Sequence, residues 1–369
     1  MSDATRLQQA VLRTLLHFLP DMREDNRLTL GYLIVGLILG RNVQLAKIAE
    51  QVNYPHKESS LEDRFRRYVN NNNIEVSIIF FPFVECILAA LSQTQLVFSM
   101  DTTKSGGNCI TLLLSVRYKS RALPLCWLSF KGKKGHSSQA IQLNLIKMID
   151  EYLAAGRQAI FLGDGEFDGS EVVDWLETQE RWQYACRTAK DTKIYYQDQW
   201  IALQDLPLKP GQEAFFPQVL FTQQTQVGPV NIIAIWNVKK KEHWFFVTDF
   251  ETLAEAKRWY EKRFTIETFF SDVKSRGFNL EKSQLKTPQR ADRLLLAVAI
   301  AYIFIVFWGV ESILTGDFKS MIRTDRFEHS LFRLGFKYIT HLLKKYRSIP
   351  FFSGLPPPHS FEHFVLVTH

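Results

Sequence analysis

The chain has 369 residues, of which 46% are hydrophobic and 22% are charged. Such a composition supports a substantial core and excludes a disordered or fibrous chain. The 45 Lys and Arg residues outnumber 38 Asp and Glu, and the resulting net charge of +7 is a modest indication of a polyanionic partner. The four cysteines show no CxxC spacing, so we expect neither a zinc knuckle nor a disulfide framework, and a cytoplasmic setting is the simplest.

The first 92 residues are predicted to be helical. Apolar residues recur at helical spacing over 45–52, and a second helix is predicted to begin at Ser59, with Glu62 three residues later as in a capping box. The basic side of this second helix could lie on DNA, although the turn before it is longer than in an ordinary helix-turn-helix. A helical cap with a solvated basic edge is the alternative.

From residue 93 the apolar pattern changes to that of strands. Three runs rich in β-branched and aromatic residues predict an antiparallel meander at 95–103, 108–118 and 123–130. A helix, a strand, a second helix and a further strand are predicted to follow, at 139–154, 159–164, 170–178 and 182–187. This order is that of a ribonuclease H-like α/β fold, so residues 93–188 are predicted to form the first part of such a core.

The remaining chain divides into three predicted parts. Residues 189–250, with several prolines and short strands, are predicted to be a β-rich insertion, after which 251–310 returns to helices and completes the core. The apolar run 294–310 has 17 residues, the lower limit for crossing a membrane, so a buried central helix is favoured over a membrane span. Residues 311–369 are predicted to be helical and basic.

Most of the net charge is concentrated near the C-terminus. Residues 319–347 contain eight Lys and Arg but only two acidic residues. This basic segment could bind DNA or a second protomer, and a solvated helix face is the alternative.

Two aspartates occur where predicted strands end. Asp101 follows the apolar run 96–100, and Asp164 ends the run 159–164 and precedes a glycine-rich turn. Ionised carboxylates are costly inside a sheet unless they are paired or bind a cation. Because the two strands are predicted to be neighbours, their carboxylates could converge on one divalent cation. A turn-capping role is the alternative for each aspartate alone.

The segment Trp259–Lys274 is predicted to form one helix with a reactive face. At about 100° per residue, Tyr260, Arg263 and Lys274 all lie within about 40° of Glu267. Apolar side chains on the adjoining arc would anchor this helix to the sheet. A salt-bridged, solvated face is the alternative, because Arg263 and Glu267 are four residues apart.

The spacing Tyr260-x2-Arg263-x3-Glu267-x6-Lys274 matches, residue for residue, a signature of bacterial insertion-sequence transposases. These enzymes have an Asp-Asp-Glu (DDE) active site and carry the Tyr-Arg-Glu-Lys signature on the helix of the Glu. The chain resembles this family over roughly residues 60–350, where two aspartates precede the signature and a β insertion separates the second from Glu267.

The resemblance implies metal-dependent phosphoryl transfer at Asp101, Asp164 and Glu267. Two Mg²⁺ or Mn²⁺ ions would flank the scissile phosphate, one activating the attacking water or 3′-hydroxyl and the other stabilising the leaving oxygen. Asp101 would bridge both ions, while Asp164 and Glu267 would each bind one.

The resemblance also assigns DNA contacts. Tyr260, Arg263 and Lys274 would contact phosphates next to the cut. Several relatives cut through a DNA hairpin, in which a flipped base stacks on an aromatic residue of the insertion, and Trp244 occupies the matching place. A buried strand Trp is the alternative for Trp244. Arg187 is a further candidate for a phosphate contact.

A DNA transposase is therefore the predicted function, with cleavage of transposon ends and joining of their 3′-hydroxyls to target DNA by cut-and-paste. Residues 1–92 would bind the ends, and a homodimer on double-stranded DNA would pair two ends in the cytoplasm, at the nucleoid. No membrane partner is expected. The alternatives are a catalytically silent DNA-binding protein derived from a transposase and a structure-specific DNA nuclease.

Overall fold

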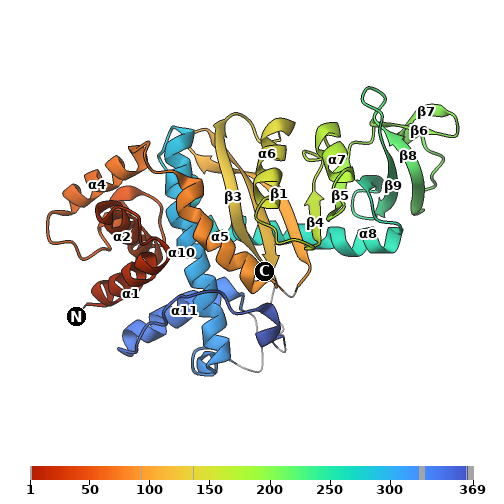
Figure 1. Ribbon diagram of the computed structural model, residues 1–369. Helices are drawn as coiled ribbons and strands as arrows, with labels where there is room; N and C mark the ends of the chain where they lie inside the picture. The colour runs from red at the N-terminus through yellow and green to blue at the C-terminus, as the bar shows by residue number, and fades with distance from the viewer. Residues whose placement is uncertain (1, 93, 136, 324–328, 363, 365–369) are drawn as a thin grey trace.

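One mixed β-sheet runs through the computed structural model, which describes residues 2–92, 94–135, 137–323, 329–362 and 364 (Figure 1). Among these residues ten strands follow the order β3-β2-β1-β4-β5-β10-β9-β8-β6-β7. Their bounds are β1 Leu96–Gly106, β2 Cys109–Tyr118, β3 Arg121–Lys131, β4 Ala159–Gly163, β5 Trp182–Thr188, β6 Lys193–Tyr196, β7 Gln199–Ala202, β8 Ala214–Phe221, β9 Val227–Asn237 and β10 Glu242–Thr248.

The first five strands confirm the predicted order. β1, β2 and β3 form an antiparallel meander, and β4 pairs in parallel with both β1 and β5. Helix α6 (Gln139–Asp150) leads into β4, and α7 (Ser170–Glu177) makes the crossover between β4 and β5 that parallel pairing requires. Every residue of β4 is buried, as expected for a strand inside a covered sheet. The chain therefore has an α/β fold with a ribonuclease H-like core.

Strands β6–β10 extend the same sheet beyond β5. β10 pairs antiparallel with β5, which brings Phe246 opposite Arg187, and β9, β8, β6 and β7 follow outward. In Figure 1 these strands lie at the end of the sheet opposite β3. The segment predicted as an insertion thus lengthens the sheet that carries the candidate site residues.

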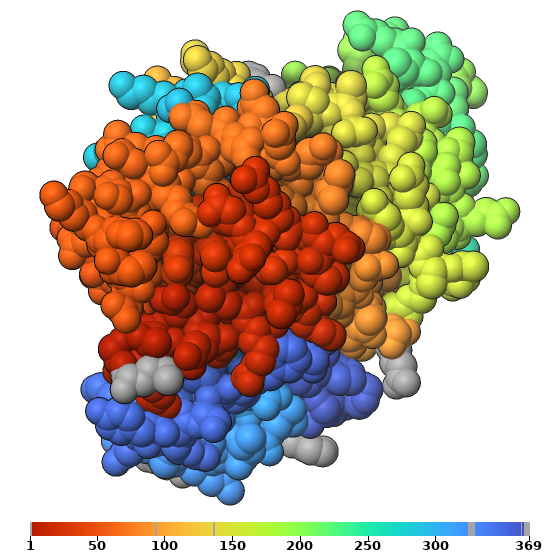
Figure 2. All heavy atoms as spheres, turned by 60° about the vertical axis from the view of Figure 1, so that its left-hand side comes forward, coloured from red at the N-terminus to blue at the C-terminus, as the bar shows by residue number. Residues whose placement is uncertain are grey.

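Helices from the two ends of the chain contact each other. Arg6 of α1 donates a hydrogen bond from Nη1 to the Leu343 carbonyl of α11 at 2.9 Å, and Figure 2 shows the N-terminal helices resting on the C-terminal segment. The remaining helices are α1 Asp3–Phe18, α2 Glu24–Gly40, α3 Leu45–Ala49, α4 Glu58–Asn70, α5 Val76–Ala90, α8 Leu253–Tyr260, α9 Thr265–Val273, α10 Pro288–Leu314 and α11 Leu331–Lys344. Short 3₁₀ turns are η1 Leu203–Asp205, η2 Glu261–Phe264, η3 Leu280–Lys282, η4 Asp317–Ser320 and η5 Pro358–Phe361.

The capping box predicted at Ser59 is wrong. Helix α4 begins at Glu58, and its N-cap residue is Lys57, whose side chain makes no capping hydrogen bond. The Lys57 carbonyl accepts from the amides of Ser60 and Leu61, so Ser59 already lies inside the first turn. A hydroxyl inside the helix cannot cap the free amides that precede it.

Helix α10 is the central helix of the molecule. It is the one helix in the described ranges that is long and apolar enough to cross a membrane, and 94% of its most apolar window is buried inside the protein. It packs against α2, α4 and α5 of the N-terminal region, against β3 of the sheet and against α11. The prediction of a buried central helix is confirmed.

Close packing of α11 on α10 depends on Gly335. A Cβ atom at this position would lie 1.8 Å from the Ile305 carbonyl oxygen, which as a backbone atom cannot rotate away. We therefore expect Gly335→Ala to lower the free energy of unfolding by about 1–3 kcal/mol, as overpacking does. Thermal unfolding followed by circular dichroism measures this change. Gly165→Ala is the control, because its Cβ would have its nearest neighbour at 3.8 Å, and equal stability of the two variants would contradict the prediction.

Candidate active site

Asp101 lies in β1, and Asp164 directly follows β4, which pairs in parallel with β1. The prediction that Asp101 ends its strand is wrong, because β1 continues to Gly106 in the long hairpin with β2 and Asp101 pairs with Leu113. In the register of β1 with β4, Ser99 is opposite Leu162, so two residues further along Asp101 stands level with Asp164. Paired strands are about 4.8 Å apart, so the two carboxylates leave the same face of the sheet as neighbours.

This face of the sheet is the one that α8 covers. Val97, Leu162 and Ala185 precede the site on their strands by an even number of residues, and they form one buried cluster with Phe246 and Tyr260. An even spacing keeps side chains on one face of a strand. The apolar cluster therefore ends where the two carboxylates begin.

Asp101 and Asp164 form a row of side chains across this face of the sheet, and Arg187 and Trp244 continue it. Ala185 of β5 is opposite Leu162 of β4, so Arg187 stands level with Asp164. The Arg187 guanidinium carbon lies 4.1 Å from the centroid of the Trp244 ring, and the Trp244 indole donates to Glu242 at 3.1 Å. Trp244 is half-buried, so part of its ring remains accessible beside the row.

A lysine-rich loop reaches over Asp101. The Lys134 ammonium nitrogen lies 3.6 Å from Asp101 Oδ1. Glu166 fixes this loop, because its carboxylate accepts from the Ser137 amide at 2.9 Å, from the Ser137 hydroxyl at 2.6 Å and from the Thr102 hydroxyl at 3.1 Å. Sequence analysis missed Glu166, although its place two residues after Asp164 in a glycine-rich turn was a usable signal.

The single helix predicted over Trp259–Lys274 is wrong. The segment consists of α8, the 3₁₀ turn η2 and α9, and Lys274 is the residue that ends α9. A 3₁₀ turn advances by about 120° per residue instead of about 100°, so the two helices present different faces. Tyr260 consequently points into the sheet, where its ring packs edge-on against Phe246 with centroids 4.4 Å apart.

Arg263 interacts with two of the acidic groups. Its Nη2 atom lies 3.5 Å from Glu267 Oε1, and its charge also acts on the Asp101 carboxylate. The Arg263 side chain is only 9% exposed and its guanidinium lies 4.5 Å from the Phe264 ring centroid. Its buried Nε donor has no acceptor in the described part of the chain. The Glu267 side chain is 57% exposed.

Burial dominates the electrostatics of the site. It raises the pKa of Asp101 to about 6, an effect that Lys134 opposes and the charge of Asp164 reinforces. Burial likewise raises the pKa of Tyr260 to about 12 and lowers the pKa of Lys274. A divalent cation would relieve the repulsion between the two aspartates, and paired carboxylate oxygens are the ligands that Mg²⁺ and Mn²⁺ prefer.

Two of the three predicted carboxylates are thus brought together and the third is not. Within the described residues, no three His, Cys, Asp or Glu side chains lie close enough to hold one metal ion. The β1–β4 register, extended by two residues, makes Asp101 and Asp164 neighbours, whereas Glu267 of α9 forms an ion pair with Arg263 of η2. Convergence of all three on metal ions remains a prediction.

Comparison with known proteins identifies the family to which the chain belongs. A family model described as "Transposase DDE domain" matches residues 101–304, more than half of the chain. No curated protein matches the sequence. Among solved structures, the cryo-EM structure of a piggyBac transposase synaptic complex with hairpin DNA is similar with a TM-score of 0.48 and 11% identity, covering 94% of this chain and 80% of that one. So distant a likeness carries no argument about the site.

Proposed function

Because the chain belongs to the family of transposases with a DDE domain, we propose that it cleaves DNA at the ends of a mobile element and joins the 3′-hydroxyls to target DNA. The parallel register of β1 with β4 carries this proposal, because its extension by two residues makes Asp101 and Asp164 neighbours. The exact Tyr-Arg-Glu-Lys spacing further supports membership of the insertion-sequence group.

Asp101, Asp164 and Glu267 would hold two Mg²⁺ or Mn²⁺ ions. Such ions activate an attacking water or 3′-hydroxyl and stabilise the leaving oxygen of the phosphate. Lys134 and Arg263 form ion pairs with two of these carboxylates, Asp101 and Glu267. Glu267 would exchange Arg263 for metal, and the buried guanidinium would then need another anion. A DNA phosphate next to the cut supplies that anion and satisfies the free Nε donor.

The other signature residues would position the strand. Lys274 ends α9 next to the acidic groups and can offer its ammonium to a phosphate. Tyr260 is buried against the sheet, so its contribution would be to fix α8 and η2 in place. Arg187 of β5 stands level with Asp164, on the side away from Asp101, and can contact a phosphate there.

Trp244 would stack on a base extruded beside the cut. Base–aromatic stacking is worth about 1–3 kcal/mol per base, so Trp244→Ala is expected to slow cleavage of the second strand by about 5- to 150-fold. Trp244→Phe keeps a ring and should retain most of the activity. Cleavage is measured on gels with an end-labelled duplex.

Trp200→Ala provides the control for Trp244→Ala, because it removes another half-buried strand tryptophan, on β7. If the two alanine variants lose the same small amount of activity, the stacking role is contradicted. Lower thermal stability of Trp244→Ala alone would instead favour a structural role for this residue.

The other regions of the chain are assigned roles from the need to pair two transposon ends. Residues 1–92 would bind the transposon ends, 93–188 and 251–310 would form the catalytic core around the β-rich insertion 189–250, and 311–369 would form a basic helical region. A homodimer would hold two ends on double-stranded DNA at the nucleoid of the cytoplasm.

A strand-transfer assay tests the proposal. The substrate is a labelled duplex that carries the inverted repeats flanking the reading frame, with a supercoiled plasmid as target and Mg²⁺ in the buffer. Joined products support a transposase. Cleavage without joined products would instead favour a structure-specific nuclease, and binding without cleavage would favour a catalytically silent DNA-binding protein.

A further inference from the structure

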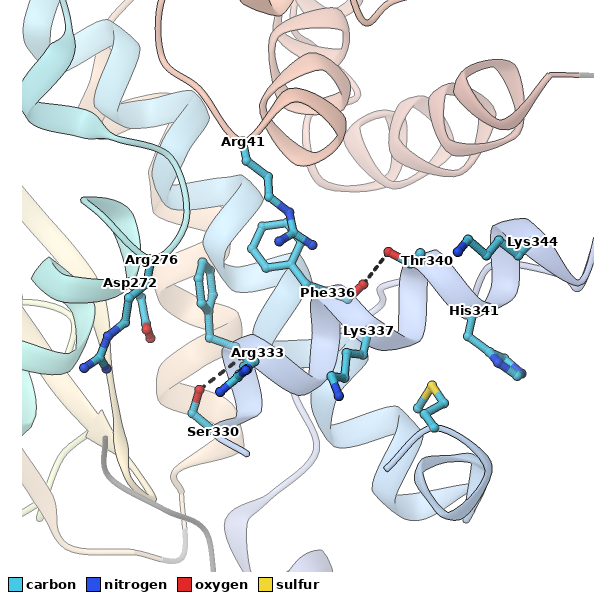
Figure 3. Close-up of a pocket in the computed structure, with 12 residues that line it drawn as sticks. Arg41, Asp272, Arg276, Ser330, Arg333, Phe336, Lys337, Thr340, His341 and Lys344 are labelled. Carbon is cyan, nitrogen blue, oxygen red and sulfur yellow. Dashed lines mark hydrogen bonds between the residues drawn. The ribbon is translucent and has the colours of Figure 1, made fainter. Parts of the chain in front are cut away.

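A large basic pocket lies apart from the row of acidic residues, between the end of α2, the end of α9 and helix α11 (Figure 3). Its volume is about 910 Å³. Five of its lining residues are cationic and one is acidic: Arg41, Arg276, Arg333, Lys337, Lys344 and Asp272. Three segments that are distant in the sequence therefore contribute positive charge to one surface.

The single acid of this pocket does not neutralise it. Asp272 Oδ2 lies 2.9 Å from Arg121 Nη1, and both side chains are almost completely buried. Across the described ranges, none of the five cations makes an ion pair with an Asp or Glu. A concentration of positive charge that lacks carboxylate partners among the described residues favours an anionic partner.

Helix α11 arranges three of the cations in a stripe. Arg333, Lys337 and Lys344 lie within about 40° of one another around the helix and span about 16 Å along it. The opposite face of α11 is buried on α10, which fixes the direction in which the stripe points. Each strand of a DNA duplex carries one phosphate per about 3.4 Å of axis, so a stripe of this length can face several phosphates.

Arg41 faces the stripe from the other side of the pocket. Its guanidinium carbon lies 4.2 Å from the centroid of the Phe336 ring, and Figure 3 shows the side chain reaching from the N-terminal helices toward α11. Loss of water around this guanidinium lowers the pKa of Arg41. A desolvated cation that rests on an aromatic ring is positioned to receive a phosphate.

Helix α9 connects the candidate active site to the pocket. Glu267 lies in the first turn of this helix, Lys274 ends it, and Arg276 follows two residues later as part of the pocket lining. The charge of Asp101 acts on Lys274, so the end of α9 lies within electrostatic reach of the acidic row. A duplex that enters the site along α9 would meet Arg276 next.

We propose that Arg41, Arg276 and the α11 stripe form a second DNA-binding surface, which grips the phosphate backbone of the duplex beyond the cleavage site. The inference rests on DNA being the substrate. Backbone contacts of this kind carry no sequence information, so the surface fixes the path of the duplex and leaves recognition of the ends to other regions.

Salt-dependent DNA binding tests this surface independently of catalysis. A fluorescein-labelled duplex of random sequence is titrated with the full chain in EDTA, and the affinity is measured by anisotropy over a range of NaCl concentrations. Each lost phosphate contact lowers the slope of log affinity against log salt by about 0.9, so Arg333→Gln, Lys337→Gln and Lys344→Gln combined should lower it by about 2.7. At physiological salt the affinity should fall roughly 100-fold.

The control variant removes the same charge elsewhere. Lys147, Lys190 and Lys209 are exposed and lie outside the pocket, and their combined replacement by Gln should leave the slope nearly unchanged. An equal fall for both triple variants would mean that only overall charge matters and would overturn the proposal. If the pocket variant loses stability in thermal unfolding, Arg333→Gln alone is tested and should lower the slope by about 0.9.

The alternative occupant is a second copy of the chain. Light scattering of the pocket variant distinguishes the two, because loss of a dimer with an unchanged salt slope would assign the pocket to a protein interface and overturn the DNA-binding role.

The proposed function is contradicted by a different result: a wild-type chain that binds no duplex and produces no cleavage. A chain that binds and cleaves DNA normally after the pocket is changed contradicts only the second surface.

Discussion

Asp101→Asn is expected to reduce Mg²⁺-dependent DNA cleavage by at least about 10³-fold, because metal ions contribute several kcal/mol to stabilising the transition state. The amide of Asn keeps the shape of the side chain but loses the charge that pairs with Lys134 and opposes Asp164. Asp164→Asn and Glu267→Gln should have effects of the same size. Cleavage of an end-labelled duplex is measured together with DNA binding in EDTA, and binding should persist.

Asp292→Asn is the matched control for Asp101→Asn. Burial also raises the pKa of Asp292 to about 6, but its carboxylate accepts from the Ser129 amide at 2.9 Å and lies on α10, outside the acidic row. Its cleavage rate should stay close to that of the wild type. Glu267→Gln is the most stringent variant, because Glu267 is the carboxylate that forms an ion pair with Arg263. Cleavage by Glu267→Gln at the wild-type rate would remove Glu267 from the metal site.

Arg121→Ala is expected to lower the free energy of unfolding by about 3–5 kcal/mol, because it leaves the buried Asp272 carboxylate without its partner. The two side chains are 0% and 2% exposed, and their ion pair joins β3 to α9. Since α9 also carries Glu267, the variant should lose activity at temperatures where the wild type remains active. Urea unfolding and cleavage as a function of temperature measure the two effects.

A double variant separates loss of the pair from loss of packing. Arg121→Met with Asp272→Leu removes both charges while keeping much of the volume, so it should recover a large part of the stability that Arg121→Ala loses. The exposed pair of Lys47 with Glu50 is the control, and Lys47→Ala should change stability by less than about 1 kcal/mol. If Arg121→Ala were no less stable than Lys47→Ala, the role assigned to the buried pair would be wrong.

The sequence predicts the core of the fold well because its strands are defined by local pattern. The meander, β4 and β5 come from continuous β-branched and aromatic runs, and the apolar length of α10 indicates its burial. The strand that contains Asp101 extends further than predicted, since hairpin pairing with β2 continues past the apolar run. Such pairing is not visible in one strand alone.

Parts of the candidate site depend on packing between distant segments. The break between α8 and α9 lets Tyr260 pack on Phe246 while Ile266 and Phe269 are also buried, and a periodicity count along one helix cannot show it. The pairing of Lys134 with Asp101 depends equally on Glu166, which holds the lysine-rich loop. The basic pocket joins residues 41, 276 and 333, so only the folded chain brings them together.

The burial of α10 has a consequence for how such a protein can be altered. Because this helix packs against the first 92 residues on one side and the sheet on the other, removing the N-terminal helices would uncover apolar surface along it. A truncated chain would aggregate instead of surviving as a free-standing nuclease module. If the N-terminal helices bind the transposon ends as proposed, new end specificity would arise through point changes on their exterior, and exchange of that whole region between relatives would require matching changes along α10.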